Sequence, residues 1–165
     1  MAVFALGASV PEIHPDAYVH PDATVIGAVR IGAESTIWPQ AVLRGDYGTI
    51  TVGARTSIHD GAVLHCTAEH STVVGDDCVI GHLAHLEGCT VEDAALVGTG
   101  SIVLHRVLVR THALVGAGAV VPAGLEVPSG AMALGAPAKL RLDAVTPDQI
   151  LPLAENYVAN ARRYR

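Results

Sequence analysis

Histidine and acidic side chains gather in one segment of the sequence. The chain has nine histidines among 165 residues, and His59, His65, His82 and His85 fall in a single stretch that ends at Glu87. Imidazole nitrogens and carboxylate oxygens are the usual donors to divalent transition metals. The same residues are equally consistent with polar side chains scattered over a surface. Their meaning therefore depends on the elements that position them.

Aliphatic residues recur every six positions through most of the sequence. The series starts with Ile13, and its longest unbroken run leads from Val91 to Ala133. A small or aliphatic residue usually lies four positions after each of these anchors. A six-residue period fits neither a helix nor a strand meander, but it is typical of a prism of short strands with three hexads in each coil. The anchors suffice for roughly six to seven coils. A β-sandwich is the rival fold, and it predicts variable loops instead of fixed steps.

The repeats predict an all-β fold, a parallel β-helix, over residues 1–142. Three interruptions break the count, and they lie at residues 48–51, 66–73 and 86–90. The period stops after Pro137, and Thr146, Pro147 and Gln149 have the types and order of a helix start with a capping box. We therefore expect residues 143–165 to contain a C-terminal α-helix that packs on the prism or on a neighbouring chain.

Composition excludes several classes of function. The net charge is −6 and Lys139 is the only lysine, so no basic stripe is available to bind nucleic acid. The sequence has no uninterrupted apolar run of membrane-spanning length, and its first residues lack the features of a signal peptide. Three cysteines without a CxxC spacing favour a reducing compartment, so we expect a cytoplasmic protein. The low share of charged residues, 16%, indicates a surface partly covered by partners.

The six-residue count also predicts which of the polar side chains lie together. His65 and Glu87 each follow the third anchor of a coil, so they should be stacked neighbours on one face. His59 and His82 follow the second anchor, which places them on a different face. These two pairs should not meet within one chain. Packing of three copies around a threefold axis would bring the two faces together and form a metal site between subunits.

Five sequence segments resemble the γ-class carbonic anhydrase family. They are residues 43–48 (LRGDYG), 56–65 (TSIHDGAVLH), 80–82 (IGH), 87–90 (EGCT) and 135–139 (GAPAK). The resemblance runs from about Ile13 to Leu142. It implies a left-handed β-helix, a homotrimer, metal sites at subunit interfaces and reversible hydration of CO₂ to bicarbonate. The implied cofactor is a divalent metal, Zn²⁺ first, with Fe²⁺ or Co²⁺ as alternatives.

The resemblance assigns the metal ligands residue by residue. His65 matches the first family ligand, and His82 matches the second, which a neighbouring chain donates. The third ligand position of the family is a histidine, and here it is Glu87. A carboxylate in that place would make the metal a weaker Lewis acid than three imidazoles do. Alternatively, His59 or His85 completes a histidine-rich set as an additional ligand, and Glu87 would then be a fourth ligand or a partner of the ligands.

Four further residues match the catalytic surroundings of the family site. Arg44 and Asp46 match a pair that bridges subunits, and Asp60 matches a structural acid. His59 stands where the family has a glutamine near the metal-bound water. The family's glutamate proton shuttle has no clear match, because the acidic insertion that carries it is missing from this sequence.

Three alternatives to an active carbonic anhydrase stay open at this point. Glu87 could pair with Arg44 and leave no metal site. The chain could be a weak or inactive homologue that binds a metal or a ferric siderophore, or that serves in assembly. The third alternative is a hexapeptide-repeat acyltransferase, although the sequence lacks a long extra loop or a further domain to cover a coenzyme A arm.

Overall fold

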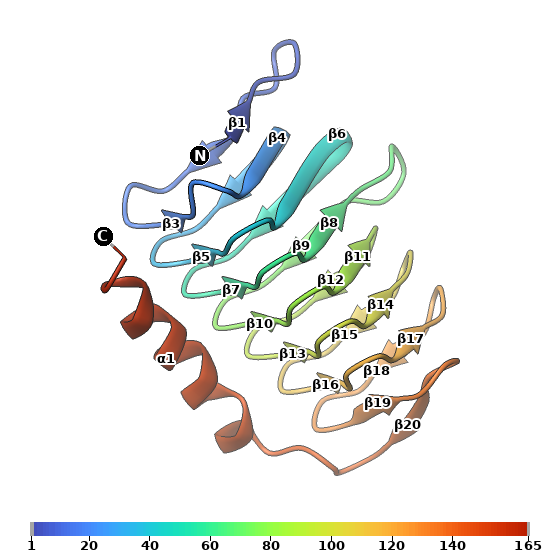
Figure 1. The fold of residues 1–165 in the computed structure, drawn as a ribbon. Helices are drawn as coiled ribbons and strands as arrows, with labels where there is room; N and C mark the ends of the chain where they lie inside the picture. Colours follow the sequence, from blue (N-terminus) through green and yellow to red (C-terminus); the bar gives the residue numbers. More distant parts are fainter. Residues whose placement is uncertain (1, 165) are drawn as a thin grey trace.

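In a computed structural model, residues 2–164 form a stack of triangular coils with a helix along one side (Figure 1). The fold is the expected all-β, left-handed parallel β-helix followed by a C-terminal helix. Neighbouring strands in the stack pair in parallel, and the antiparallel pair β19–β20 closes its C-terminal end. Residues 1 and 165, the outer ends of the two regions expected from the sequence, lie outside the described residues.

The prism has three faces, named here A, B and C. Face A consists of β1 (Ala2–Phe4), the first part of β4 (Thr24–Ile31), the first part of β6 (Val42–Val52), β8 (Val63–His65), β11 (His85–Glu87), β14 (Ile102–Val103) and β17 (Val120–Val121). Face B consists of β2 (Glu12–Ile13), the second parts of β4 and β6, β9 (Thr72–Val74), β12 (Thr90–Val91), β15 (Leu108–Val109) and β18 (Glu126–Val127). Face C consists of β3 (Tyr18–Val19), β5 (Thr36–Ile37), β7 (Ser57–Ile58), β10 (Val79–Ile80), β13 (Leu96–Val97), β16 (Leu114–Val115), β19 (Met132–Leu134) and β20 (Lys139–Arg141).

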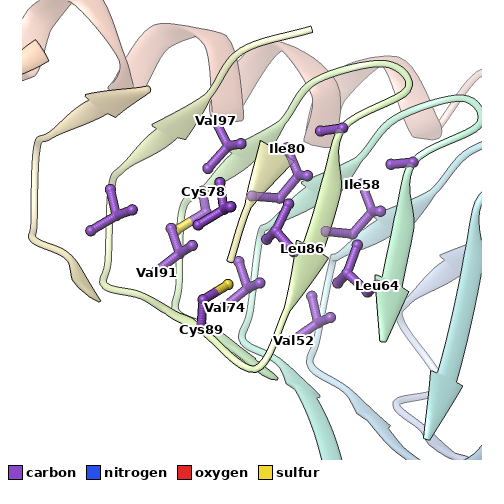
Figure 2. Packing of buried hydrophobic residues seen from close by; sticks show 14 of the residues in the cluster. Val52, Ile58, Leu64, Val74, Cys78, Ile80, Leu86, Cys89, Val91 and Val97 are labelled. Atoms are coloured by element: carbon purple, nitrogen blue, oxygen red, sulfur yellow. The ribbon is translucent and has the colours of Figure 1, made fainter. Parts of the chain in front are cut away.

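The anchors of the six-residue period form the core of the stack. All of them are buried except Ile13 and Val19, which are partly buried against the same cluster. Figure 2 shows the repeated pattern, with Ile58 and Leu64 in one coil and Ile80 and Leu86 in the next. Burial of a continuous aliphatic column gives each coil its stability, since a single coil has no core of its own.

Sharp corners separate the faces, and the chain turns them in the left-handed backbone region. Glu34, Arg55 and Asp77 have φ values of 58°, 54° and 55°. The residues that follow them, Ser35, Thr56 and Cys78, are fully buried. A compact side chain fits there because the corner brings the backbone close to the column, which explains the small or aliphatic residue four positions after most anchors.

The three interruptions of the period are present, with shifted bounds in two cases. The first lies between Gly45 and Ile50, where the register between β4 and β6 shifts, so it begins before the predicted residue 48. The second ends before Thr72, because Thr72 and Val73 belong to β9 and not to the loop. The third is confirmed, since Leu86 and Val91 are successive anchors only five positions apart.

The C-terminal helix starts later than its capping pattern predicts. A 3₁₀ turn, η1, spans Pro147–Gln149, and α1 spans Leu151–Ala161. The backbone N–H of Thr146 donates to Oε1 of Gln149 at 2.8 Å, so the capping pattern stabilises the 3₁₀ turn. Helix α1 lies along the outside of face C, against β5 and β7 (Figure 1). Among residues 2–164, no helix has the length and apolar character needed to cross a membrane.

Candidate functional site

The predicted stacking of His65 and Glu87 is confirmed. Arg44 in β6, His65 in β8 and Glu87 in β11 are direct register partners on face A. Each follows a buried leucine anchor, so its side chain points away from the core. The three side chains therefore form one outward column on successive coils.

His65 is held between two carboxylates. Its Nδ1 lies 2.9 Å from Oε1 of Glu87, and its Nε2 lies 2.8 Å from Oδ1 of Asp46. Asp46 also accepts a hydrogen bond from Arg44. Arg44 thus pairs with Asp46 and not with Glu87, so the alternative in which Glu87 and Arg44 neutralise each other is wrong for the described chain.

Both carboxylates favour the ionised form. The hydrogen bond with His65 lowers the pKa of Glu87, against the opposing effect of partial burial. Burial also opposes ionisation of Asp46, but hydrogen bonds with His65 and Arg44 outweigh it and lower the pKa of that carboxyl. At neutral pH, face A therefore presents one imidazole, that of His65, between two ionised carboxylates.

Two more histidines surround Glu87. Oε2 of Glu87 lies 3.5 Å from Nε2 of His85 and 3.8 Å from Nε2 of His105. His105 was not among the candidate residues from the sequence. It comes two positions after the anchor Val103, on the coil that follows Glu87. The residue one position after that anchor is Leu104, so the count that stacks His65 on Glu87 does not by itself find His105.

A second group of side chains lies on face C. Nδ1 of His82 is 2.9 Å from the carboxylate of Asp60. The ring of His59 lies between His82, with centroids 4.6 Å apart, and Tyr157 of α1, with centroids 4.2 Å apart. The expected proximity of His59 and His82 on one face is confirmed.

His59 is the buried histidine of this group. It is only 3% exposed, and neither ring nitrogen has a hydrogen-bond partner within the described part of the chain. Burial lowers the pKa of His59 to about 4, and repulsion from His82 adds to the effect, although Asp60 opposes it. The imidazole is therefore neutral at pH 7.

The two groups belong to different faces, as the count of hexads predicts. No set of three or more His, Cys, Asp or Glu side chains within residues 2–164 is arranged to hold a metal ion.

The donors present in each group nevertheless suit a divalent metal. His82 contacts Asp60 through Nδ1, while its Nε2 makes no hydrogen bond to any residue that the structure describes. A carboxylate on one nitrogen and a free lone pair on the other is the usual arrangement of a metal-ligating histidine. If His65 bound a metal through one ring nitrogen, the metal would replace the carboxylate at that nitrogen, and the carboxylate at the other nitrogen would still orient the ring.

Comparison with known proteins places this fold and these residues in a family. A family profile described as bacterial transferase hexapeptide (six repeats) matches residues 11–45. Gamma carbonic anhydrase 1, mitochondrial, from Arabidopsis thaliana is 40% identical over 152 residues, which cover 88% of this chain and 55% of the plant protein. Carnitine operon protein CaiE from Salmonella agona is 37% identical, over 91% of this chain and 75% of CaiE.

The solved structures agree with the sequence relatives. The crystal structure of a hexapeptide transferase family protein from Anaplasma phagocytophilum has a TM-score of 0.94 and 34% identity, and the match covers 99% of this chain and 98% of that protein. This chain belongs to the hexapeptide-repeat family that includes γ-class carbonic anhydrases and CaiE proteins. It spans about half the length of the plant carbonic anhydrases it matches.

Proposed function

We propose that this chain is a γ-carbonic anhydrase-like protein with metal sites between the subunits of a homotrimer, and that it hydrates CO₂ reversibly to bicarbonate. One observation carries the proposal. His65 and Glu87 lie in register on face A, while His82, with Nε2 unpartnered among the described residues, lies on face C. A cyclic trimer sets the face of one copy against a different face of the next, which would unite the two half-sites.

The assignment of ligands follows from this arrangement. His65 and Glu87 of one copy and His82 of a second copy would hold the metal, with His85 as an additional ligand. Zn²⁺ is the first candidate, with Fe²⁺ or Co²⁺ as alternatives, because the donor set contains nitrogen and carboxylate oxygen. A divalent metal held there would supply the nucleophile by making its water more acidic, and it would polarise the substrate.

The other residues of the site would act on the ligands and on the interface. Asp60 orients His82 through Nδ1, and Asp46 orients His65 through Nε2. Arg44 neutralises the charge of Asp46 and, in the trimer, would lie at the contact between subunits. His59 packs against His82. These contacts would keep the imidazoles in the orientation that a metal requires.

Apolar side chains around the face A column support a subunit interface. Val63 and Ile102 are 36% and 37% exposed on strands β8 and β14, and Tyr47 next to Asp46 is 71% exposed. Such exposed apolar groups beside a half-site favour burial against another copy. CO₂ and bicarbonate would be the substrates.

A second candidate is a homologue with weak activity or none, which binds a metal or a siderophore or serves in assembly. Glu87 in place of a histidine favours it, since both ring nitrogens of His65 have carboxylate partners within one chain. An acyltransferase is the third candidate, suggested by the transferase names of some relatives. A cytoplasmic location is proposed from Cys66, Cys78 and Cys89, which are all free and buried.

Metal analysis and CO₂ hydration on untagged protein test the proposal. We expect a trimer by sedimentation equilibrium, about one Zn²⁺ per chain after reconstitution, and stopped-flow CO₂ hydration that rises with pH. His82→Gln should abolish metal binding and hydration, whereas His14→Gln, at an exposed histidine that pairs with Asp16, should change neither. A monomer at micromolar concentration would refute the interfacial site. Full metal occupancy without hydration would favour the second candidate.

A further inference from the structure

Three aromatic rings connect the C-terminal helix to the half-site on face C. They belong to Tyr157 of α1, His59 after β7 and His82 after β10. The centroid distances are 4.2 Å from Tyr157 to His59 and 4.6 Å from His59 to His82. The interplanar angles are 54° and 55°, so the rings pack tilted against one another. We call this set the Tyr157–His59–His82 column.

His59, the middle ring of the column, interacts with its neighbours by ring packing and not by hydrogen bonds. His59 is 3% exposed, and its two nitrogens have no partner within residues 2–164. A buried polar atom without a partner costs free energy, so an apolar ring would fit this place at least as well for stability alone. What His59 provides to its surroundings is therefore a rigid ring between the helix and His82.

His82 is restrained from two directions. The carboxylate of Asp60 contacts Nδ1 at 2.9 Å, and the ring of His59 covers one side of the imidazole. The side chain is otherwise open, with 48% of it exposed. Removing the His59 contact would leave a single polar contact to determine the ring orientation.

The packing of α1 against the prism holds Tyr157, the residue at the helix end of the column, in place. Ala154 and Ala161 of α1 and its N-cap residue Ile150 are buried, and Tyr157 also contacts Trp38 at a centroid distance of 6.2 Å. If the helix moved, Tyr157 would move with it, and the packing of His59 and then of His82 would change.

We propose that Tyr157 and His59 are positioning residues for His82, which makes helix α1 a structural part of the candidate metal site. This inference rests on the proposed function. A ligand histidine that is already held in one orientation loses less conformational freedom when it binds a metal, so its affinity is higher.

Metal affinity of variants along the column tests the inference. Tyr157→Ala should weaken Zn²⁺ binding, measured by competition with a chelator, by about 10- to 100-fold, the range seen when an orienting partner of a ligand is removed. Its Co²⁺ derivative should show an altered visible spectrum. Tyr157→Phe keeps the ring and should retain the wild-type affinity and spectrum.

A matched control separates the column from the helix in general. Tyr164→Ala removes a ring of the same C-terminal segment, which packs on Trp38 at a centroid distance of 5.2 Å; among the described residues, the rings that pack on His59 are those of His82 and Tyr157. It should retain the wild-type affinity. If Tyr157→Ala does not fold, His59→Ala interrupts the column from the prism side and should give the same loss. Equal losses in Tyr157→Ala and Tyr164→Ala, or unchanged affinity in a folded column variant, would overturn the inference.

A measurement without metal distinguishes this inference from the proposed function. In crystals of the metal-free protein, His82 should occupy one side-chain conformer in the wild type and several in Tyr157→Ala. If the wild type binds no metal at all, the proposed function fails, and the conformers of His82 alone decide on the positioning role. A single, unchanged conformer in the variant would refute it.

Discussion

Acidification from pH 7 to pH 5 should destabilise the folded chain through the buried imidazole of His59. The pKa of His59 is about 4 in the folded state, compared with 6.5 for an ordinary histidine. The unfolded chain therefore binds more protons between these two values. Above pH 6.5 the neutral His59 does not reduce the free energy of unfolding, and the free energy of unfolding falls as the pH drops from 6.5 toward 4.

The magnitude follows from the two pKa values. At pH 5 the unfolded imidazole is almost fully protonated, and the folded one is almost fully neutral. Linkage then gives a loss of about 2 kcal/mol in the free energy of unfolding per chain, relative to pH 7. A loss of this size is a large part of the stability of a typical domain.

Urea denaturation at pH 7 and pH 5 measures this loss. Other groups also titrate in this range, so the quantity of interest is the difference between the wild type and His59→Phe, which fills the same space without a titrating group. A chelator keeps metals from His82, and equal protein concentrations keep the effect of assembly constant. His14→Phe, at an exposed histidine, is the matched control and should show the wild-type loss.

The expected result is that His59→Phe loses about 2 kcal/mol less than the wild type between the two pH values. If both proteins lose the same free energy, His59 does not remain neutral in the folded state, and the argument from its burial is refuted. If His14→Phe behaves like His59→Phe, the effect does not come from burial.

Three further predictions concern the core, a close backbone approach and the candidate site. Val97→Asp places a charge in the fully buried column and should cost about 3–5 kcal/mol in urea denaturation; an unchanged midpoint would contradict the register. Gly27→Ala should cost well over the roughly 1–2 kcal/mol expected for Gly100→Ala, since both have positive φ but only the new Cβ at Gly27 meets a carbonyl oxygen, at 2.3 Å. Glu87→His removes a negative charge from the donor set, so stopped-flow CO₂ hydration at pH 7 should be faster at matched zinc occupancy; equal rates would show that Glu87 does not limit activity.

Counting along the sequence predicted the part of the site that depends on spacing. Every coil of a prism contains a set number of hexads, so the residue after an anchor is placed by covalent steps alone. This is why the stacking of His65 on Glu87 and the separation of His82 on another face followed from the sequence. His105 does not follow from this rule, because the residue directly after the anchor on its coil is Leu104; the approach of His105 to Glu87 became visible only in the structure.

The sequence by itself thus determined the prism, its aliphatic core and the faces on which the pairs His65–Glu87 and His59–His82 lie, because all three depend on a six-residue period. Only the tertiary structure decided which side chains contact each other across loops and between elements. Asp46 reaches His65 from the bulge of β6, and Tyr157 reaches His59 from a helix that is separated from it by most of the chain. Such contacts depend on how a bulge bends and where a helix packs, and no repeat in the sequence specifies either.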